Sequence, residues 1–137
     1  MSLFVDTSVW SLALRRAEPP DLPHVRRLRV ALEGGEVICT TGVVLQELLQ
    51  GFSGPTAVDQ IVKRFAALPY VVPERRDHIC AAQLRNTCRR AGLQVGSIDA
   101  LLAQLCIERG LQMLSADRDF EGVASHSKLA LWSDASD

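Results

Sequence analysis

The sequence predicts a three-layer α/β domain with a mostly parallel central sheet. Short β-rich runs alternate along the chain with longer stretches of helical periodicity, which is typical of this fold class. Several of the runs are apolar on both faces, as expected for strands covered by helices on both sides. The chain has 137 residues, 47% of them hydrophobic, which fits one core. We therefore expect residues 1–137 to form a single domain.

Five short runs are the predicted strands, because each is rich in apolar or β-branched residues. They cover residues 3–5, 37–40, 70–72, 112–114 and 128–132. The stretches between them predict helices over residues 7–18, 21–33, 43–52, 56–68, 77–91 and 97–109. The hydroxyls of Thr7, Ser8 and Ser97 and the carboxylate of Asp77 stand where helix caps are expected.

Composition and charge exclude several classes of protein. The net charge is −1, so no bulk positive field attracts a polyanion, and nucleic-acid contacts would have to be local. Aromatic residues make up only 5% of the chain, which disfavours a platform that stacks successive unpaired bases. The N-terminal residues do not resemble a signal peptide, and no stretch approaches the roughly 20 apolar residues of a membrane span. We expect a cytoplasmic protein without membrane contacts.

The four cysteines do not predict a zinc site or a disulfide framework. Cys39, Cys80, Cys88 and Cys106 form no CxxC pair. Cys80 and Cys88 share one helical face with Leu84, where reduced cysteine behaves as a small hydrophobic residue. Buried thiols are the expected outcome.

Acidic residues recur at one predicted edge of the sheet. Asp6 directly follows the first strand, and Asp117 lies just past the run 112–114. Glu47 falls in the first turns of the helix that follows the run 37–40, and Asp99 falls in the first turn of the helix that Ser97 is expected to cap. Because strand C-termini and helix N-termini share one edge of a parallel sheet, these four side chains should face one another. Asp119 is placed to join or to orient them.

Four clustered carboxylates repel one another unless a cation lies among them or their pKa values rise. Oxygen ligands without a neighbouring histidine favour Mg²⁺ or Mn²⁺ over Zn²⁺. Taken singly, each acid has a simpler explanation, such as a favourable helix dipole, an Asx turn or a solvated surface. The joint placement of the four carries the metal-site interpretation.

Four segments carry these acids: FVDTSVW at residues 4–10, VLQEL at 44–48, SIDALLA at 97–103 and LSADRDF at 114–120. In this order and spacing they resemble the four acidic motifs of PIN-domain ribonucleases, most closely the VapC-type toxins of bacterial toxin-antitoxin modules. The resemblance covers essentially the whole chain. It implies a five-stranded parallel sheet, a homodimer and inhibition by a small VapB-type antitoxin.

The resemblance also implies a function, namely Mg²⁺-dependent endonucleolytic cleavage of RNA, often transfer RNA or ribosomal RNA. Position by position, it assigns Asp6, Glu47, Asp99 and Asp117 to the catalytic, metal-binding quartet and Asp119 to an auxiliary metal-binding acid. Two supporting hydroxyls follow. Ser8 matches the hydroxyl of the first motif, and Ser115 stands where threonine is common.

The chemistry expected is attack of a metal-activated water on phosphorus, with Glu47 as a water-bridged ligand or as the base. Arg15 and Arg16, at the end of the first helix, are the first candidates for contacts with RNA phosphates, although a solvated helix face explains each equally well. A metal-dependent DNA nuclease and a catalytically silent PIN scaffold that binds RNA or protein are the alternative functions. The complete set of acids disfavours the silent scaffold.

The helices between residues 43 and 68 present apolar faces at Leu45, Leu48, Phe52, Ile61 and Phe65. The default interpretation is core packing. The family resemblance raises a second one, a groove in which an antitoxin helix docks.

Overall fold

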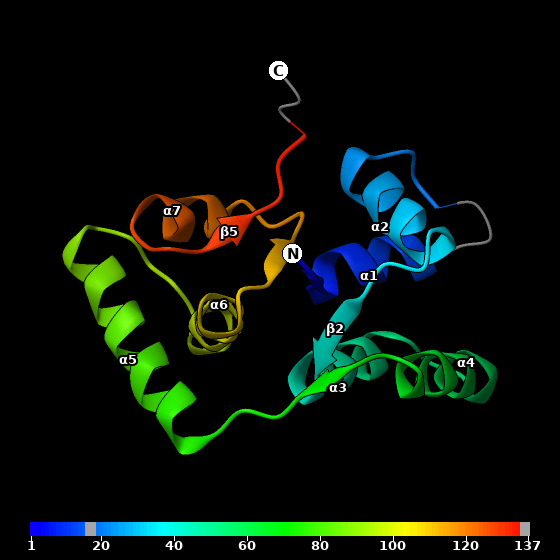
Figure 1. Ribbon diagram of the computed structural model, residues 1–137. Helices are drawn as coiled ribbons and strands as arrows, with labels where there is room; N and C mark the ends of the chain where they lie inside the picture. The colour runs from blue at the N-terminus through cyan, green and yellow to red at the C-terminus, as the bar shows by residue number, and fades with distance from the viewer. Residues whose placement is uncertain (16–18, 135–137) are drawn as a thin grey trace.

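The computed structural model describes residues 1–15 and 19–134. Within these residues, strands and helices alternate along the chain (Figure 1). The elements are β1 (Leu3–Val5), α1 (Thr7–Leu14), α2 (Pro23–Glu33), β2 (Ile38–Thr41), α3 (Gly42–Gly51), α4 (Pro55–Ala66), β3 (Tyr70–Val71), α5 (Arg75–Arg90), α6 (Ser97–Arg109), β4 (Gln112–Leu114), α7 (Asp119–Ser125) and β5 (Ala130–Leu131).

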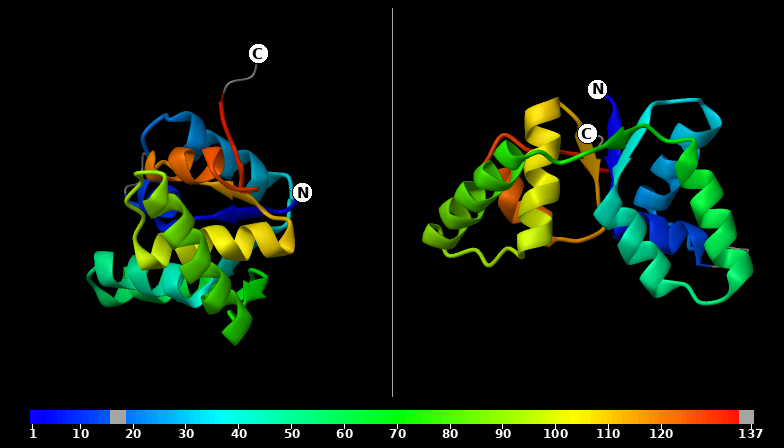
Figure 2. Two further views of the ribbon diagram at one scale, coloured as in Figure 1. Left: turned by 90° about the vertical axis from the view of Figure 1, so that its left-hand side faces the viewer. Right: turned by 90° about the horizontal axis from the view of Figure 1, so that it is seen from below.

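The five strands form one sheet in the order β3-β2-β1-β4-β5, and every pairing is parallel. This confirms the predicted fold class. The chain moves outward from β1 to β3 and then crosses to β4 and β5, so right-handed crossovers place α1 to α4 on one face and α5 to α7 on the other. The view from below shows these two groups of helices on opposite sides of the sheet (right panel of Figure 2).

The reversal of strand order falls between the neighbouring strands β1 and β4. Their register pairs Val5 with Leu114, so the residues that follow, Asp6 and Ser115, leave the sheet side by side. The Asp6 amide also donates to the Leu114 carbonyl at 3.1 Å. Ligands of open parallel sheets bind in the crevice outside the carboxyl ends of the strands at such a reversal.

The core fills the space between the sheet and both helix layers. Its largest fully buried side chains include Phe4, Trp10, Phe120 and Met113. The ring centroids of Trp10 and Phe65 lie 4.9 Å apart, which joins α1 to α4. Cys39, Cys88 and Cys106 are buried and free, and Cys80 is partly buried and free, which confirms the expectation for the thiols.

Several helix boundaries differ from the prediction. The first helix ends at Leu14, well before Pro19, and its N-cap is Asp6, so the predicted caps Thr7 and Ser8 lie inside it. Ser97 is the first residue of α6 and Gly96 holds the cap position. The short helix α7 was not predicted, because its seven residues include Gly122 and begin with a sequence typical of a turn.

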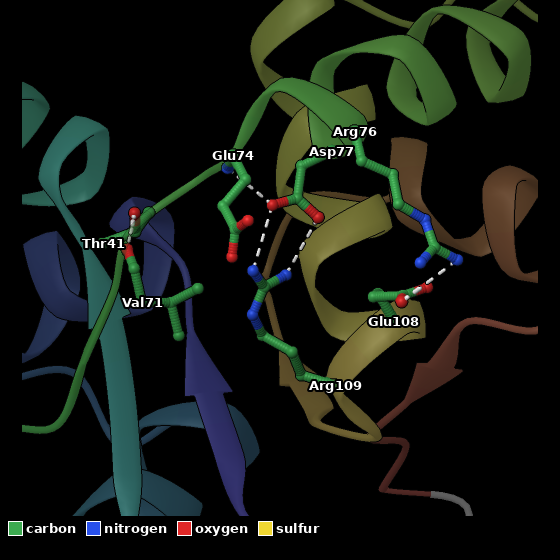
Figure 3. A network of polar contacts seen from close by, with 7 residues as sticks. All are labelled: Thr41, Val71, Glu74, Arg76, Asp77, Glu108 and Arg109. Carbon is green, nitrogen blue, oxygen red and sulfur yellow. Dashed lines mark hydrogen bonds and ion pairs between the residues drawn. The ribbon is translucent and has the colours of Figure 1, made fainter.

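Helix α5 begins at Arg75, so Asp77 is not its cap but lies within its first turn. There the Asp77 carboxylate accepts the Glu74 amide at 2.8 Å and two hydrogen bonds from the Arg109 guanidinium, at 3.1 and 3.0 Å (Figure 3). The hydrogen bonds from Arg109 lower the pKa of Asp77. The pair joins the start of α5 to the end of α6, and Arg76 adds an ion pair with Glu108 at 3.4 Å.

Among the helices described, none is both long and apolar enough to cross a membrane.

Candidate metal centre

Five carboxylates lie at the carboxyl edge of the sheet, each brought there by a different element. Asp6 follows β1, Glu47 lies in the second turn of α3, and Asp99 lies in the first turn of α6. Asp117 lies in the loop after β4, and Asp119 begins α7. One oxygen each of Asp99, Asp117 and Asp119 lies within 4.8 Å of the others. Asp6 and Glu47 are not part of this closest group.

Asp6 is held by two serine hydroxyls and is only 5% exposed. Ser8 Oγ donates to its Oδ1 at 2.5 Å, and Ser115 Oγ donates to its Oδ2 at 2.8 Å. The same hydroxyls accept backbone amides, Ser8 that of Ala116 at 2.9 Å and Ser115 that of Asp117 at 3.0 Å. Because each hydroxyl has one proton, these amides direct both protons toward Asp6.

Burial raises the pKa of Asp6, and the bonds from Ser8 and Ser115 oppose that rise. The negative charge of Asp117 raises it further. The hydroxyls therefore favour the ionised form of a carboxylate that its surroundings otherwise disfavour. They also connect the first strand to the loop after the fourth strand.

The Glu47 carboxylate is held by Thr7, whose hydroxyl was predicted only to cap a helix. Thr7 Oγ1 donates to Glu47 Oε1 at 2.7 Å, so the hydroxyl orients an acid 40 positions further along the chain. The position of Thr7 directly after Asp6 places it at the same edge of the sheet, but no pattern in the sequence names Glu47 as its partner. The hydrogen bond from Thr7 goes to Oε1 of Glu47 and does not involve Oε2.

The pKa of Asp99 responds to the charges of the other four acids. Its pKa is raised from 3.8 to about 6, first by burial and then by the charges of Asp117, Asp6, Glu47 and Asp119. The charges of all four other acids therefore reach Asp99, although only Asp117 and Asp119 belong to its closest group. A cation among them would remove the repulsion that raises this pKa.

The donor set fits a hard divalent cation. Asp99, Asp117 and Asp119 each offer one carboxylate oxygen at a spacing compatible with a shared ion. The amide of Asp119 donates to Asp117 Oδ1 at 2.9 Å, which fixes the turn that presents both acids. Oxygen ligands of this kind suit Mg²⁺ or Mn²⁺.

Of the two predicted phosphate contacts, Arg15 is the C-cap residue of α1. Arg15 is exposed, and its guanidinium donates to Ser11 Oγ at 3.2 Å. Arg16 lies outside the described residues.

Known proteins share this architecture over nearly their full length. VapBC2 from Rickettsia felis, solved with a DNA fragment from its promoter, has a TM-score of 0.74 at 19% identity, over 97% of this chain and 100% of that chain. VapBC-1 from nontypeable Haemophilus influenzae has a TM-score of 0.74 at 12% identity, over 96% of this chain and 97% of the other. Mycobacterium tuberculosis VapC20, a toxin that cleaves the sarcin-ricin loop, has a TM-score of 0.68 at 22% identity, over 93% of this chain and 98% of the other.

At these identities the structures establish the fold. The family comparison goes further, because the PIN domain matches residues 3–125, which include all five carboxylates. PIN domains are nucleases. The chain belongs to the PIN domain family.

Proposed function

We propose that this protein is a Mg²⁺-dependent endoribonuclease that acts in the cytoplasm as the toxin of a type II toxin-antitoxin system. The observation that carries the proposal is the convergence of five carboxylates, of which Asp99 has a pKa raised to about 6. A nuclease that holds a divalent cation needs such a cluster of oxygen ligands. The likeness to VapC20, which cleaves an RNA loop, supports RNA as the substrate.

In this proposal Asp99, Asp117 and Asp119 hold the ion directly, and Asp6 completes the binding site through the oxygens that its serines orient. When bound, Mg²⁺ lowers the pKa of a water and neutralises charge on the phosphate. Glu47 accepts the proton of the attacking water or holds a water in place, because Thr7 fixes one of its oxygens and leaves the other for this role. Mn²⁺ substitutes for Mg²⁺ in such a site.

The test is cleavage of a mixed RNA by the purified protein. We expect cleavage with Mg²⁺ or Mn²⁺, none in chelator, and none for Asp6→Ala, Asp99→Asn or Asp117→Asn with the fold retained by circular dichroism. Asp59→Asn is the matched control, because this exposed carboxylate on α4 pairs with Lys63 one helix turn away. Full activity in chelator, or in Asp99→Asn, would contradict the metal mechanism. Cleavage of DNA but not of RNA would assign a different substrate.

An antitoxin partner is part of the same proposal, because the similar structures include VapBC complexes. A hollow of about 690 Å³ lies where the ends of α1 and α2 meet α3 and α4, with Leu14, Leu32, Phe52 and Ile61 on its walls. Lys63 and Arg64 lie at the same hollow. We propose that a VapB-type helix with apolar and acidic residues docks there. Co-expression with the open reading frame next to this gene should yield a complex that no longer cleaves RNA.

The proposal also includes a homodimer, as the family resemblance implies. Sedimentation velocity of the purified protein should show twice the mass of the chain, and a monomer would contradict this part alone.

A further inference from the structure

A second feature of the carboxyl edge is a hollow of about 360 Å³ that adjoins the carboxylates. Asp117 and Ser115 form part of its wall, so it opens directly beside the candidate metal centre. His24 of α2, Arg118 of the loop after β4 and Trp132 after β5 also line it, together with Glu121 of α7 and Asp134. Its volume lies within the range of about 300 to 1,000 Å³ that is usual for ligand pockets.

The wall of the hollow has an aromatic part that is held in place. The rings of His24 and Trp132 meet edge to face with centroids 5.0 Å apart. The amide of Trp132 donates to the Met113 carbonyl at 2.8 Å, which fixes its backbone beside β4. The indole is partly buried against the core and also borders the hollow. A positioned indole beside open space favours a flat ligand, which loses little freedom when it stacks there.

The charges around the hollow suit a nucleotide. Arg118 supplies a guanidinium, the group that best matches the geometry of phosphate. Asp117, Glu121 and Asp134 supply three carboxylates, which accept hydrogen bonds from the amino groups of bases. A phosphate at the metal centre would place a neighbouring nucleotide within reach of this wall, since both share Asp117.

We propose that the hollow receives one unpaired base of the RNA, stacked against Trp132, with Arg118 at the phosphate of that nucleotide. The inference rests on the proposed ribonuclease function and adds to it the place where the base next to the cleaved bond is held. Proteins read unpaired bases by stacking them on aromatic side chains, and a base within a duplex is not available for this. A single aromatic wall binds one base, in keeping with the low aromatic content of the chain.

Intrinsic fluorescence tests binding without cleavage. The chain has two tryptophans, and Trp10 is fully buried, so an RNA-dependent change in emission reports Trp132. Wild-type protein in chelator is titrated with a short single-stranded RNA, and cleavage of the same RNA is measured separately with metal. The same oligonucleotide is then tested with the base removed at one position at a time.

We expect the intact RNA to quench the emission, and one abasic position to remove the quenching and weaken binding by about 5- to 100-fold. Trp132→Phe should still bind the RNA and lose the signal. Equal affinity and equal quenching for every abasic RNA would overturn the proposal, as would an emission that RNA does not change.

Cleavage kinetics give an independent readout. Trp132→Ala should lower kcat/KM about 10- to 100-fold, whereas Trp132→Tyr should stay within about threefold of wild type because it keeps a stacking ring. Mn²⁺ affinity should be the same in all three proteins. If Trp132→Ala fails to fold, cleavage of the abasic RNAs by wild-type protein still tests for the base site. Without a base site, wild-type protein would cut intact and abasic RNA at the same rate.

The two proposals fail in different ways. RNA-dependent quenching by a protein that cleaves no RNA would remove the ribonuclease function and leave the base site. Metal-dependent cleavage that is indifferent to Trp132→Ala and to every abasic position would remove the base site and leave the ribonuclease.

Discussion

Replacing Asp99 by asparagine should stabilise the protein in the absence of metal. The pKa of this carboxyl rises from 3.8 to about 6 on folding, so the charged form is less favourable in the folded protein than in the unfolded chain. At about 1.4 kcal/mol for each factor of ten in the dissociation constant, the ceiling of this penalty is about 3 kcal/mol. The side chain is only partly buried, so we expect about 1 to 2 kcal/mol after solvent screening.

The sign gives a distinctive pH dependence. A raised carboxyl pKa destabilises the folded protein fully above the folded value of about 6, and the penalty disappears as the pH falls below 3.8. The gain from Asp99→Asn should therefore be complete at about pH 7.5 and about half as large at pH 5. Urea denaturation in chelator at both values measures it.

Asp59→Asn is the control, because this exposed carboxylate should change the free energy of unfolding by less than about 0.5 kcal/mol. Added Mg²⁺ should raise the stability of wild type and leave Asp99→Asn unchanged, since an ion stabilises only a protein that binds it. An Asp99→Asn variant that is no more stable than wild type in chelator, or equally more stable at both pH values, would refute the electrostatic reasoning.

Three further predictions concern residues that support the site or the fold. Arg109→Ala should lower the free energy of unfolding by about 2 to 3 kcal/mol in urea denaturation, because the Asp77 side chain is 5% exposed and would keep its charge without a partner. The pKa of Asp77 is lowered in the folded protein, so the stabilisation by this pair is present above pH 3.8 and is lost as the pH falls through the folded pKa. Ser115→Ala should reduce Mn²⁺ affinity about tenfold and Ser115→Thr should restore it, so equal titration curves would exclude a positioning role. Thr7→Val should slow RNA cleavage about tenfold with Mn²⁺ affinity unchanged, and an unchanged rate would show that Glu47 needs no orienting hydroxyl.

The strands were the most predictable part of the fold. The first and fourth strands match the prediction at both ends, because short apolar runs buried on both faces have few other interpretations. The start of α5 was less predictable, since Asp77 resembles a cap in sequence but lies inside the helix where Arg109, far along the chain, pairs with it. A partner at such a separation leaves no local signal.

The edge of the sheet at which the candidate site lies was predictable, whereas the distances between its side chains were less so. Strand ends and helix starts determine which acids share an edge, and that argument brought Asp6, Glu47, Asp99 and Asp117 together and left Asp119 either to join or to orient them; the charges of the other four acids all act on Asp99. It could not show that Asp119 is nearer to Asp99 and Asp117 than Asp6 is, because that depends on the unpredicted helix α7. Nor could it assign Thr7 and the two serines their partners, since hydroxyl bonds depend on rotamers.

The carboxylate cluster also has a consequence for the making of the protein. Its first member follows the first strand and its last two follow the fourth, so a ribosome must complete most of the chain before the set exists. A nascent chain that stops before Ser115, or the N-terminal product of a cut between α5 and β4, lacks both Asp117 and Asp119. Premature termination or cleavage in this stretch therefore leaves an N-terminal fragment with at most three of the five carboxylates, and the cluster forms only once the chain extends through Asp119.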